Sequence, residues 1–213
     1  MRNNTQRLTV SGIMIALGTL LSFLALYRLP YGGSVTVFSM VPVMLVAFIY
    51  GVRWGLLSGA VFGALQALLG ATTSAAFADQ RWWGVFLILL LDYIVAFSVL
   101  GLAGIFKKNG KNAAGSFALG CAAAGFLRLC AHFVSGVILF GGWAQWYFTQ
   151  DGFPAFGAKI LERTSGLELS AVYSLIYNAS YMIPETVLTV FAAVILINVK
   201  PIKKIAFENT NKM

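Results

Sequence analysis

The chain has 213 residues, of which 59% are hydrophobic and only 10% are charged, and its mean hydropathy is +0.82. A soluble domain carries roughly a quarter of its residues as charged side chains, so this composition excludes an ordinary water-soluble fold. The apolar residues come in long runs, and a bilayer can absorb that much apolar surface where a soluble core cannot. The sequence therefore predicts a polytopic, all-α integral membrane protein.

Six apolar segments predict a bundle of six transmembrane helices that forms a single membrane domain over residues 1–213. Their approximate ranges are 9–27, 35–50, 54–71, 84–106, 114–141 and 170–198. The first segment is expected to be a retained helix, because no small-residue cleavage site follows it. The second is short and is interrupted by Pro42, so a broken or irregular helix is expected there. The long connection from 142 to 169 is rich in aromatic residues, glycine and charge.

The net charge of +8 is better explained by membrane topology than by a nucleic-acid partner, because the basic residues collect at segment ends. With both termini in the cytoplasm, the basic residues on inside segments are Arg2, Arg7, Arg53, Lys107, Lys108, Lys111, Lys200, Lys203, Lys204 and Lys212. Those on outside segments are Arg28, Arg81, Lys159 and Arg163, and Arg128 lies within a span. This bias predicts a multi-pass membrane protein whose 142–169 connection faces outward, and we expect it in a plasma membrane of bacterial type.

The sequence lacks the common motifs of metal-dependent hydrolysis, nucleophilic catalysis and nucleotide binding. It contains no HExxH zinc motif, no GxSxG nucleophile elbow and no GxxxxGK[ST] phosphate loop. Cys121 and Cys130 lie nine residues apart in one apolar run, so on a helix they point to opposite faces and act as packing residues. We therefore expect no enzyme, no metal and no cofactor. Any ATP used in transport must be hydrolysed by another subunit.

A few polar side chains lie inside the apolar segments, where such groups usually face a protein interior or a water-filled cavity. Asp92 and Tyr93 lie in the fourth segment, and His132, the only histidine, lies in the fifth. The last segment carries tyrosines at four-residue spacing from Tyr173 onward, with Asn178 beside them. At 1.5 Å per residue these groups fall at similar depth in the outer half of the bundle. Three helices with polar groups at one level predict a pocket open to the exterior.

The predicted pocket favours a particular kind of ligand. A buried carboxylate must be neutralised, which favours a cation or a ring with an amino group. Aromatic faces, for which Trp82 and Trp143 in the outer connections are candidates, favour flat or cationic ligands. The expected ligand is a small aromatic molecule with a positive charge or an amino group. Arg128 is a competing partner for Asp92, and the sequence leaves that pairing open.

Four stretches carry a resemblance to a known family, and they read VPVMLVAFIYGVRWGLLSGAVFGALQALLG, LLDYIVAFSVLGLAGIF, HFVSGVILF and VYSLIYNASYMIPE. In this order and spacing the sequence resembles the thiamine-specific substrate-binding (S) components of energy-coupling factor transporters over most of its length. The resemblance implies a six-helix bundle that binds thiamine near the outer face. It also implies docking on a transmembrane coupling protein with two ATPase subunits.

The same resemblance implies roles for individual residues. The family's binding residues fall on Asp92, Tyr93, His132, Gly136, Tyr173 and Asn178. Its first-helix AxxxA docking motif reads Gly12 and Ala16 here. Small residues at this spacing, which recur from 51 to 63, fit either internal packing or docking of another membrane subunit.

Two aromatic positions depart from the family pattern. The tryptophan that closes the site from the first outer loop falls on Gly32 and Gly33 in this chain. A second stacking tryptophan falls near Phe140, with Trp143 following closely, and Trp82 is a further candidate for one aromatic face.

Two other functions stay open at the level of sequence. One is an S component for another vitamin or a thiamine precursor. The other is a self-contained proton-coupled carrier that uses Asp92 and Glu185 as relay groups. An intramembrane enzyme ranks below both, since the sequence offers no evident nucleophile or metal set.

Overall fold

The computed structural model describes residues 2–29, 32–73, 75–78, 80–107, 112–150, 152 and 154–208. Its longer helices are α1 (Arg2–Ser22), α2 (Val41–Tyr50), α3 (Val52–Thr73), α6 (Ala113–Leu139) and α9 (Gly166–Asn198). Residues 82–104 form one continuous helical run made of α4 (Trp82–Ile88), η3 (Leu89–Val95), α5 (Ala96–Ser98) and η4 (Val99–Gly104). The shorter elements are β1 (Ala25–Arg28), β2 (Ser34–Thr36), η2 (Ala75–Phe77), η5 (Gly141–Trp143), α7 (Ala144–Phe148), α8 (Pro154–Arg163) and α10 (Lys200–Glu208).

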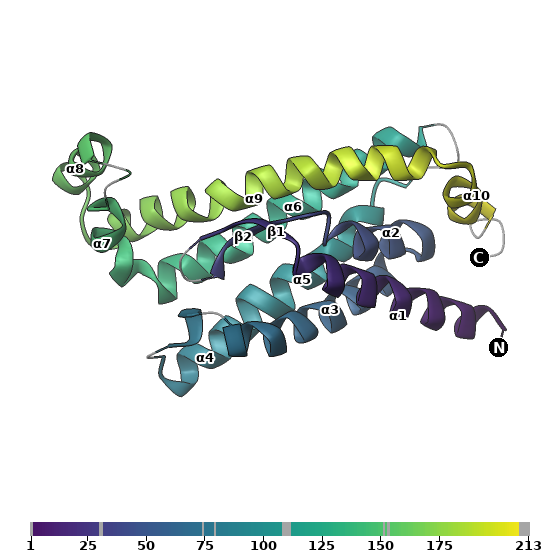
Figure 1. Cartoon of the computed structure of the whole chain (residues 1–213), viewed down its shortest axis with the longest axis horizontal. Coiled ribbons are helices and arrows are strands. Elements are labelled where there is room, and N and C mark those ends of the chain that lie inside the picture. Colours follow the sequence, from purple (N-terminus) through teal and green to yellow (C-terminus); the bar gives the residue numbers. More distant parts are fainter. Residues whose placement is uncertain are drawn as a thin grey trace.

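The long helices run roughly along one axis (Figure 1). In this view α6 and α9 lie along one side of the molecule, and α1 and α3 lie along the other. The start of α1 and the helix α10 lie at one end, and α7 and α8 lie at the opposite end. Lys108, Lys111 and Lys212, on which part of the predicted charge bias depends, fall outside the described residues.

Within the residues that the structure describes, four helical stretches are long and apolar enough to cross a membrane, namely Val52–Gly70, Trp82–Gly104, Ala113–Leu139 and Gly166–Asn198. They lie within a few residues of the last four predicted segments. Exposed apolar side chains recur every four residues along α9, at Ile183, Val187, Phe191 and Ile195. A stripe of this kind on the outside of the protein is a surface that lipid tails would cover.

The first two predicted segments differ from the structure. The first helix begins at Arg2 and already ends at Ser22, and residues 25–28, predicted as helix in part, form a strand instead. This strand pairs antiparallel with β2, with Arg28 opposite Ser34. The expected helix over 35–50 is therefore wrong in its first part.

Helix α2 begins only at Val41, with Pro42 in its first turn. Proline is favoured at that position because the first N–H groups of a helix have no intrahelical acceptor. Pro42 thus starts the helix and does not interrupt it. The ten residues of α2 span about 15 Å, which is half of the roughly 30 Å hydrocarbon core, so a count of six crossings stays a prediction.

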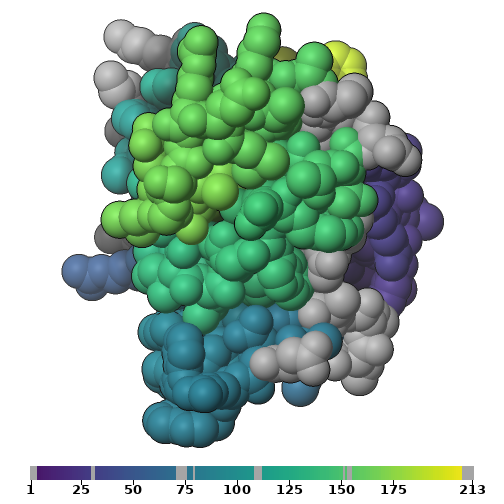
Figure 2. All heavy atoms as spheres, turned by 90° about the vertical axis from the view of Figure 1, so that its left-hand side faces the viewer, coloured from purple at the N-terminus to yellow at the C-terminus, as the bar shows by residue number. Residues whose placement is uncertain are grey.

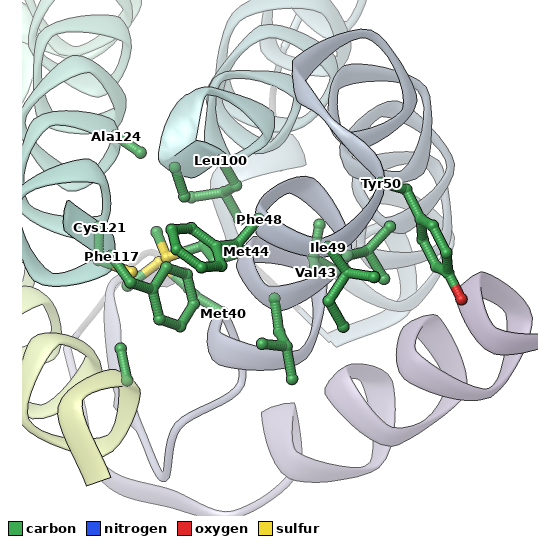
Figure 3. Close-up of a cluster of buried hydrophobic side chains, with 14 of the residues drawn as sticks. Met40, Val43, Met44, Phe48, Ile49, Tyr50, Leu100, Phe117, Cys121 and Ala124 are labelled. Carbon is green, nitrogen blue, oxygen red and sulfur yellow. The ribbon is translucent and has the colours of Figure 1, made fainter. Parts of the chain in front are cut away.

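One apolar core of the protein is built around α2, all of whose residues are buried. Figure 3 shows Met44 and Phe48 of α2 beside Phe117 and Cys121 of α6. The rings of Phe48 and Phe117 lie 4.7 Å apart between centroids. Cys121 is buried, Cys130 is half-buried, and both are free thiols, as predicted.

Small residues of α3 are used inside the protein. A Cβ atom added to Gly55, Gly59 or Gly63 would collide with backbone atoms of the 82–104 run. These glycines therefore let two helices touch, and the stretch is not a free docking face. Gly12 on α1 is different, because it is exposed and an added Cβ would meet nothing within 4 Å.

The long connection before α9 contains the short helices α7 and α8. Figure 2 views this end of the molecule, with α7, α8 and the start of α9 in green above the start of α4 in blue. Phe148 and Ala144 of α7 are buried in a second apolar cluster that includes Tyr173 of α9. Packing of α7 thus fixes the connection beside the first turns of α9.

Candidate binding site

A cavity of about 400 Å³ lies between the helices and the β1–β2 hairpin. This volume is in the range of small-molecule sites in proteins. Its walls come from the end of α1, the hairpin, α3, the 82–104 run, α6 and α9. Of the eight binding residues predicted from sequence, six line it together, namely Asp92, Tyr93, His132, Gly136, Tyr173 and Asn178.

Asp92 and Tyr93 lie on a π-helical segment, η3. Such a segment widens one turn of a helix and is frequent at functional sites, because it redirects side chains that an α-helix would hold elsewhere. Gly70 of α3 faces this turn, and a Cβ added there would collide with the Tyr93 hydroxyl. The Tyr93 ring also stacks on Phe77, with centroids 5.8 Å apart. The wide turn and the absent side chain at Gly70 together hold Tyr93 at the cavity wall.

The carboxylate of Asp92 accepts hydrogen bonds from α6 at both oxygens. Nδ1 of His132 lies 2.8 Å from Oδ1, and the hydroxyl of Ser135 donates a short hydrogen bond to Oδ2. With an ionised carboxylate, Nδ1 of His132 is the donor in this contact, and in the neutral imidazole Nε2 then carries the lone pair. Nε2 is buried and has no hydrogen-bond partner within the described part of the chain. A buried nitrogen without a partner costs free energy, which a ligand that bonds to it can offset.

Asn178 lines the cavity, but protein groups already occupy its amide. Its Nδ2 donates to the carbonyl of Ser174 at 2.8 Å and to that of His132 at 3.3 Å. Its Oδ1 accepts from the Tyr181 hydroxyl at 2.8 Å. Gly136 permits this approach of α6 and α9, because an added Cβ there would collide with the Ser174 hydroxyl. In this structure Asn178 therefore fixes the backbone of His132.

Arg128 lines the cavity and is paired with Glu185, not with Asp92. Nη1 of Arg128 lies 3.8 Å from Oε2 of Glu185, and its guanidinium lies 4.3 Å from the ring centroid of Phe97. Glu185 is 2% exposed and also accepts a 2.6 Å hydrogen bond from Thr36, the last residue of β2. The buried charges of Arg128 and Glu185 thus compensate each other. The hydrogen-bond partners of Asp92 are instead His132 and Ser135 of α6.

The structure does not place the two predicted tryptophans in the cavity wall. Trp82 is the first residue of α4 and is 83% exposed, and Trp143 packs on Phe140 with centroids 5.5 Å apart. The aromatic residues that line the cavity are Phe23, Tyr93, Phe97, Phe140, Tyr173, Tyr177 and Tyr181. Where a loop places a tryptophan cannot be inferred from spacing alone.

Three residues of the site went unassigned in the sequence prediction. Tyr177 and Tyr181 follow Tyr173 at four-residue steps, so the helical period already put all three on one stripe. Ser135 lies three residues after His132, one turn further along the same helix. The hairpin also closes on this stripe, since the N–H of Gly33 donates to the Tyr177 hydroxyl at 3.3 Å.

The fold and the cavity define a class: the molecule is a multi-pass helical membrane protein with a ligand-sized cavity between its helices. Residues 8–147 match the family described as thiamine transporter protein (Thia_YuaJ). The chain belongs to this family.

Two known proteins are similar to this chain. The thiamine transporter ThiT of Bacillus subtilis (strain 168) is 31% identical over 206 residues, and the alignment covers 92% of each chain. A solved structure of ThiT from Listeria monocytogenes matches 96% of this chain and 98% of its own, with a TM-score of 0.69 at 20% identity. That likeness shows a shared fold.

Proposed function

We propose that the protein is the substrate-capturing subunit, or S component, of an energy-coupling factor importer, and that it binds thiamine in the cavity. The observation that carries the proposal is the Asp92–His132 contact, which presents a carboxylate and the unbonded Nε2 of an imidazole among aromatic walls. Thiamine joins a flat aminopyrimidine to a cationic thiazolium ring. Its amino group and its charge both complement a carboxylate, and its two rings complement aromatic faces.

Within this proposal the polar residues bind and orient the pyrimidine. Asp92 accepts from the exocyclic amino group, and Nε2 of His132 contacts a ring nitrogen. Tyr93 and Tyr173 supply wall contacts, and Gly136 keeps the wall free of side chain where α6 meets α9. Asn178 holds the backbone of His132 in place.

Delivery across the membrane requires partners. The sequence has no phosphate-binding loop of its own, so ATP hydrolysis falls to two ATPase subunits joined by a transmembrane coupling protein. The exposed Gly12 and Ala16 of α1 are the proposed contact with that coupling protein, because small residues allow close helix approach. The positive-inside rule then puts both termini in the cytoplasm and the cavity mouth outside, in the plasma membrane.

Binding is tested by titrating the purified protein with thiamine while following tryptophan fluorescence. Trp143 is a suitable reporter, since it packs on Phe140, which lines the cavity. We expect a saturable change with thiamine and none with riboflavin or biotin. The reverse pattern would contradict the proposal and favour an S component for another vitamin.

The carrier alternative makes a different prediction in liposomes. If the protein is a proton-coupled carrier, liposomes that contain this chain alone will accumulate thiamine under a pH gradient. If it is an S component, uptake will also require the coupling protein, the ATPase subunits and ATP. The engagement of Glu185 by Arg128 and Thr36 argues against Glu185 as a free relay group.

A further inference from the structure

The last helix, α10, leaves the direction of α9 where the exposed apolar stripe of α9 ends. The stripe continues at its four-residue spacing from Ile195 to Val199, which is 42% exposed. Val199 has an extended backbone after the last turn of α9, and α10 begins at the next residue, Lys200. Figure 1 shows α10 turned across the line of α9. A helix that turns where the lipid-covered surface stops lies at the level of the lipid headgroups.

The protein itself covers the apolar face of α10. Ala206 is fully buried, and Ile202 and Phe207 pack against the core around α2. The ring of Phe207 meets that of Phe48 edge to face, with centroids 6.3 Å apart. The Nζ atom of Lys107 lies 5.6 Å from the first of these aromatic partners on α2, Phe48, and 5.8 Å from Phe207. These contacts fix the orientation of α10, and they fix the direction of its opposite face as well.

The opposite face of α10 is basic. Lys200, Lys203 and Lys204 are exposed on it. Neither Lys200 nor Lys203 takes part in an ion pair among the described residues. In the sequence, the segments predicted to lie inside contain a single acidic residue, Glu208. An exposed group of lysines directly after a membrane-spanning helix is suited to an anionic membrane surface.

We propose that the basic face of α10, centred on Lys200 and Lys203, binds the headgroups of anionic phospholipids. In the proposed orientation these lipids belong to the cytoplasmic leaflet. The lysine ammonium groups donate charge-assisted hydrogen bonds to lipid phosphate oxygens. Because α10 covers the core around α2, lipid bound to the folded protein stabilises this packing by linkage. The proposal concerns a surface outside the cavity and does not depend on which ligand the cavity binds.

The test follows thermal unfolding of the full-length protein in mixed micelles with phosphatidylglycerol or with phosphatidylcholine of the same acyl chains. We expect phosphatidylglycerol to raise the unfolding temperature clearly more than phosphatidylcholine does. Native mass spectrometry then measures the affinity for phosphatidylglycerol, which should be about tenfold weaker in the double variant Lys200→Gln with Lys203→Gln. Added salt should reduce the effect of phosphatidylglycerol more in the wild type than in this variant.

Lys159→Gln with Arg163→Gln is the matched control. It removes the same charge from two exposed residues of another short helix, α8, which lies at the opposite end of the molecule (Figure 1). This control should keep the full effect of phosphatidylglycerol. An equal loss in both double variants would mean that net charge, and not α10, attracts the lipid, which would overturn the proposal.

The remaining outcomes also decide. An unchanged phosphatidylglycerol affinity in Lys200→Gln with Lys203→Gln overturns the proposal. If this variant is already less stable in phosphatidylcholine, Lys200→Arg with Lys203→Arg decides, because it keeps the charge: a retained phosphatidylglycerol effect supports the proposal and a lost one overturns it. If the glutamine variant binds phosphatidylglycerol normally but loses uptake with the coupling protein and ATPases, the basic face is a protein contact and the lipid proposal is wrong.

Failure of the thiamine function would be seen separately. Neither Lys200 nor Lys203 lines the cavity, so thiamine binding should be the same in the wild type and in Lys200→Gln with Lys203→Gln. A wild type that binds phosphatidylglycerol but not thiamine would contradict the proposed function and leave the lipid contact of α10 standing.

Discussion

Nδ1 of His132 lies 2.8 Å from Oδ1 of Asp92, although the two residues are forty positions apart in the chain. The contact joins the C-terminal third of α6 to the π-helical turn of the 82–104 run. Because Ser135 donates to the other carboxylate oxygen, both oxygens of Asp92 are oriented by α6. The carboxylate is thus held in one direction before any ligand arrives, which reduces the entropy lost on binding.

Replacing Asp92 tests the role of its charge. We expect Asp92→Ala to weaken thiamine binding about a hundredfold or more, in line with the 2–5 kcal/mol typical of a buried charged contact. Asp92→Glu should weaken it less, since the carboxylate is kept. Calorimetry measures both, with Glu168→Ala, an exposed acid of α9, as the control. Equal affinity of Asp92→Ala and wild type would mean that the carboxylate does not contact the ligand.

Replacing Glu185 tests the buried ion pair. Glu185→Gln leaves Arg128 without its counter-charge, and breaking such a pair typically costs about 3–5 kcal/mol of stability. We expect a clearly lower unfolding temperature in detergent. The double variant Arg128→Met with Glu185→Gln should recover part of the loss, because no lone charge is then buried. A single variant as stable as the wild type would rule out this compensation.

Gly70→Ala tests how Tyr93 is positioned. The added methyl group would occupy the place of the Tyr93 hydroxyl, so the ring must shift, at a cost of about 1–3 kcal/mol typical of overpacking. We expect weaker thiamine binding in the same titration. Gly142→Ala is the control, because an added Cβ there meets nothing within 4 Å. Unchanged affinity of Gly70→Ala would show that the Tyr93 hydroxyl is not needed at that place.

Docking through α1 is tested by separating capture from transport. Gly12→Leu fills an open face of α1, so we expect normal thiamine binding by the purified subunit and strongly reduced uptake in cells that supply the coupling protein and ATPases. Val187→Leu, on the exposed stripe of α9, should reduce neither. Full uptake by Gly12→Leu would place the docking surface elsewhere.

The centre of the site could be predicted from the sequence for a physical reason. Asp92 and His132 are conspicuous because charged or titratable groups are rare within apolar segments, where they need partners. The rise per residue of a helix then placed Asp92 and His132 at similar depth in the membrane, which was enough to predict that both line one pocket. The pairing of Arg128 could not be predicted, because spacing along separate helices does not decide between Asp92 and Glu185.

The hairpin was harder to predict from local pattern. The β1 stretch ALYR continues the apolar run of the first segment, and the short β2 stretch is followed by more apolar sequence. The contacts that hold this region are non-local, such as the hydrogen bond from Thr36 to Glu185. A residue pair separated by 149 positions leaves no mark in either local sequence.

The most direct test of the account uses the fact that His132 is the only histidine in the chain. In protein labelled with ¹⁵N at histidine, every imidazole signal in an NMR spectrum comes from this side chain. We predict a single saturable shift of the Nε2 signal as thiamine is added, and a much larger thiamine requirement for that shift in Asp92→Ala. Saturable thiamine binding by fluorescence with no change in the His132 signals would contradict a site centred on Asp92 and His132.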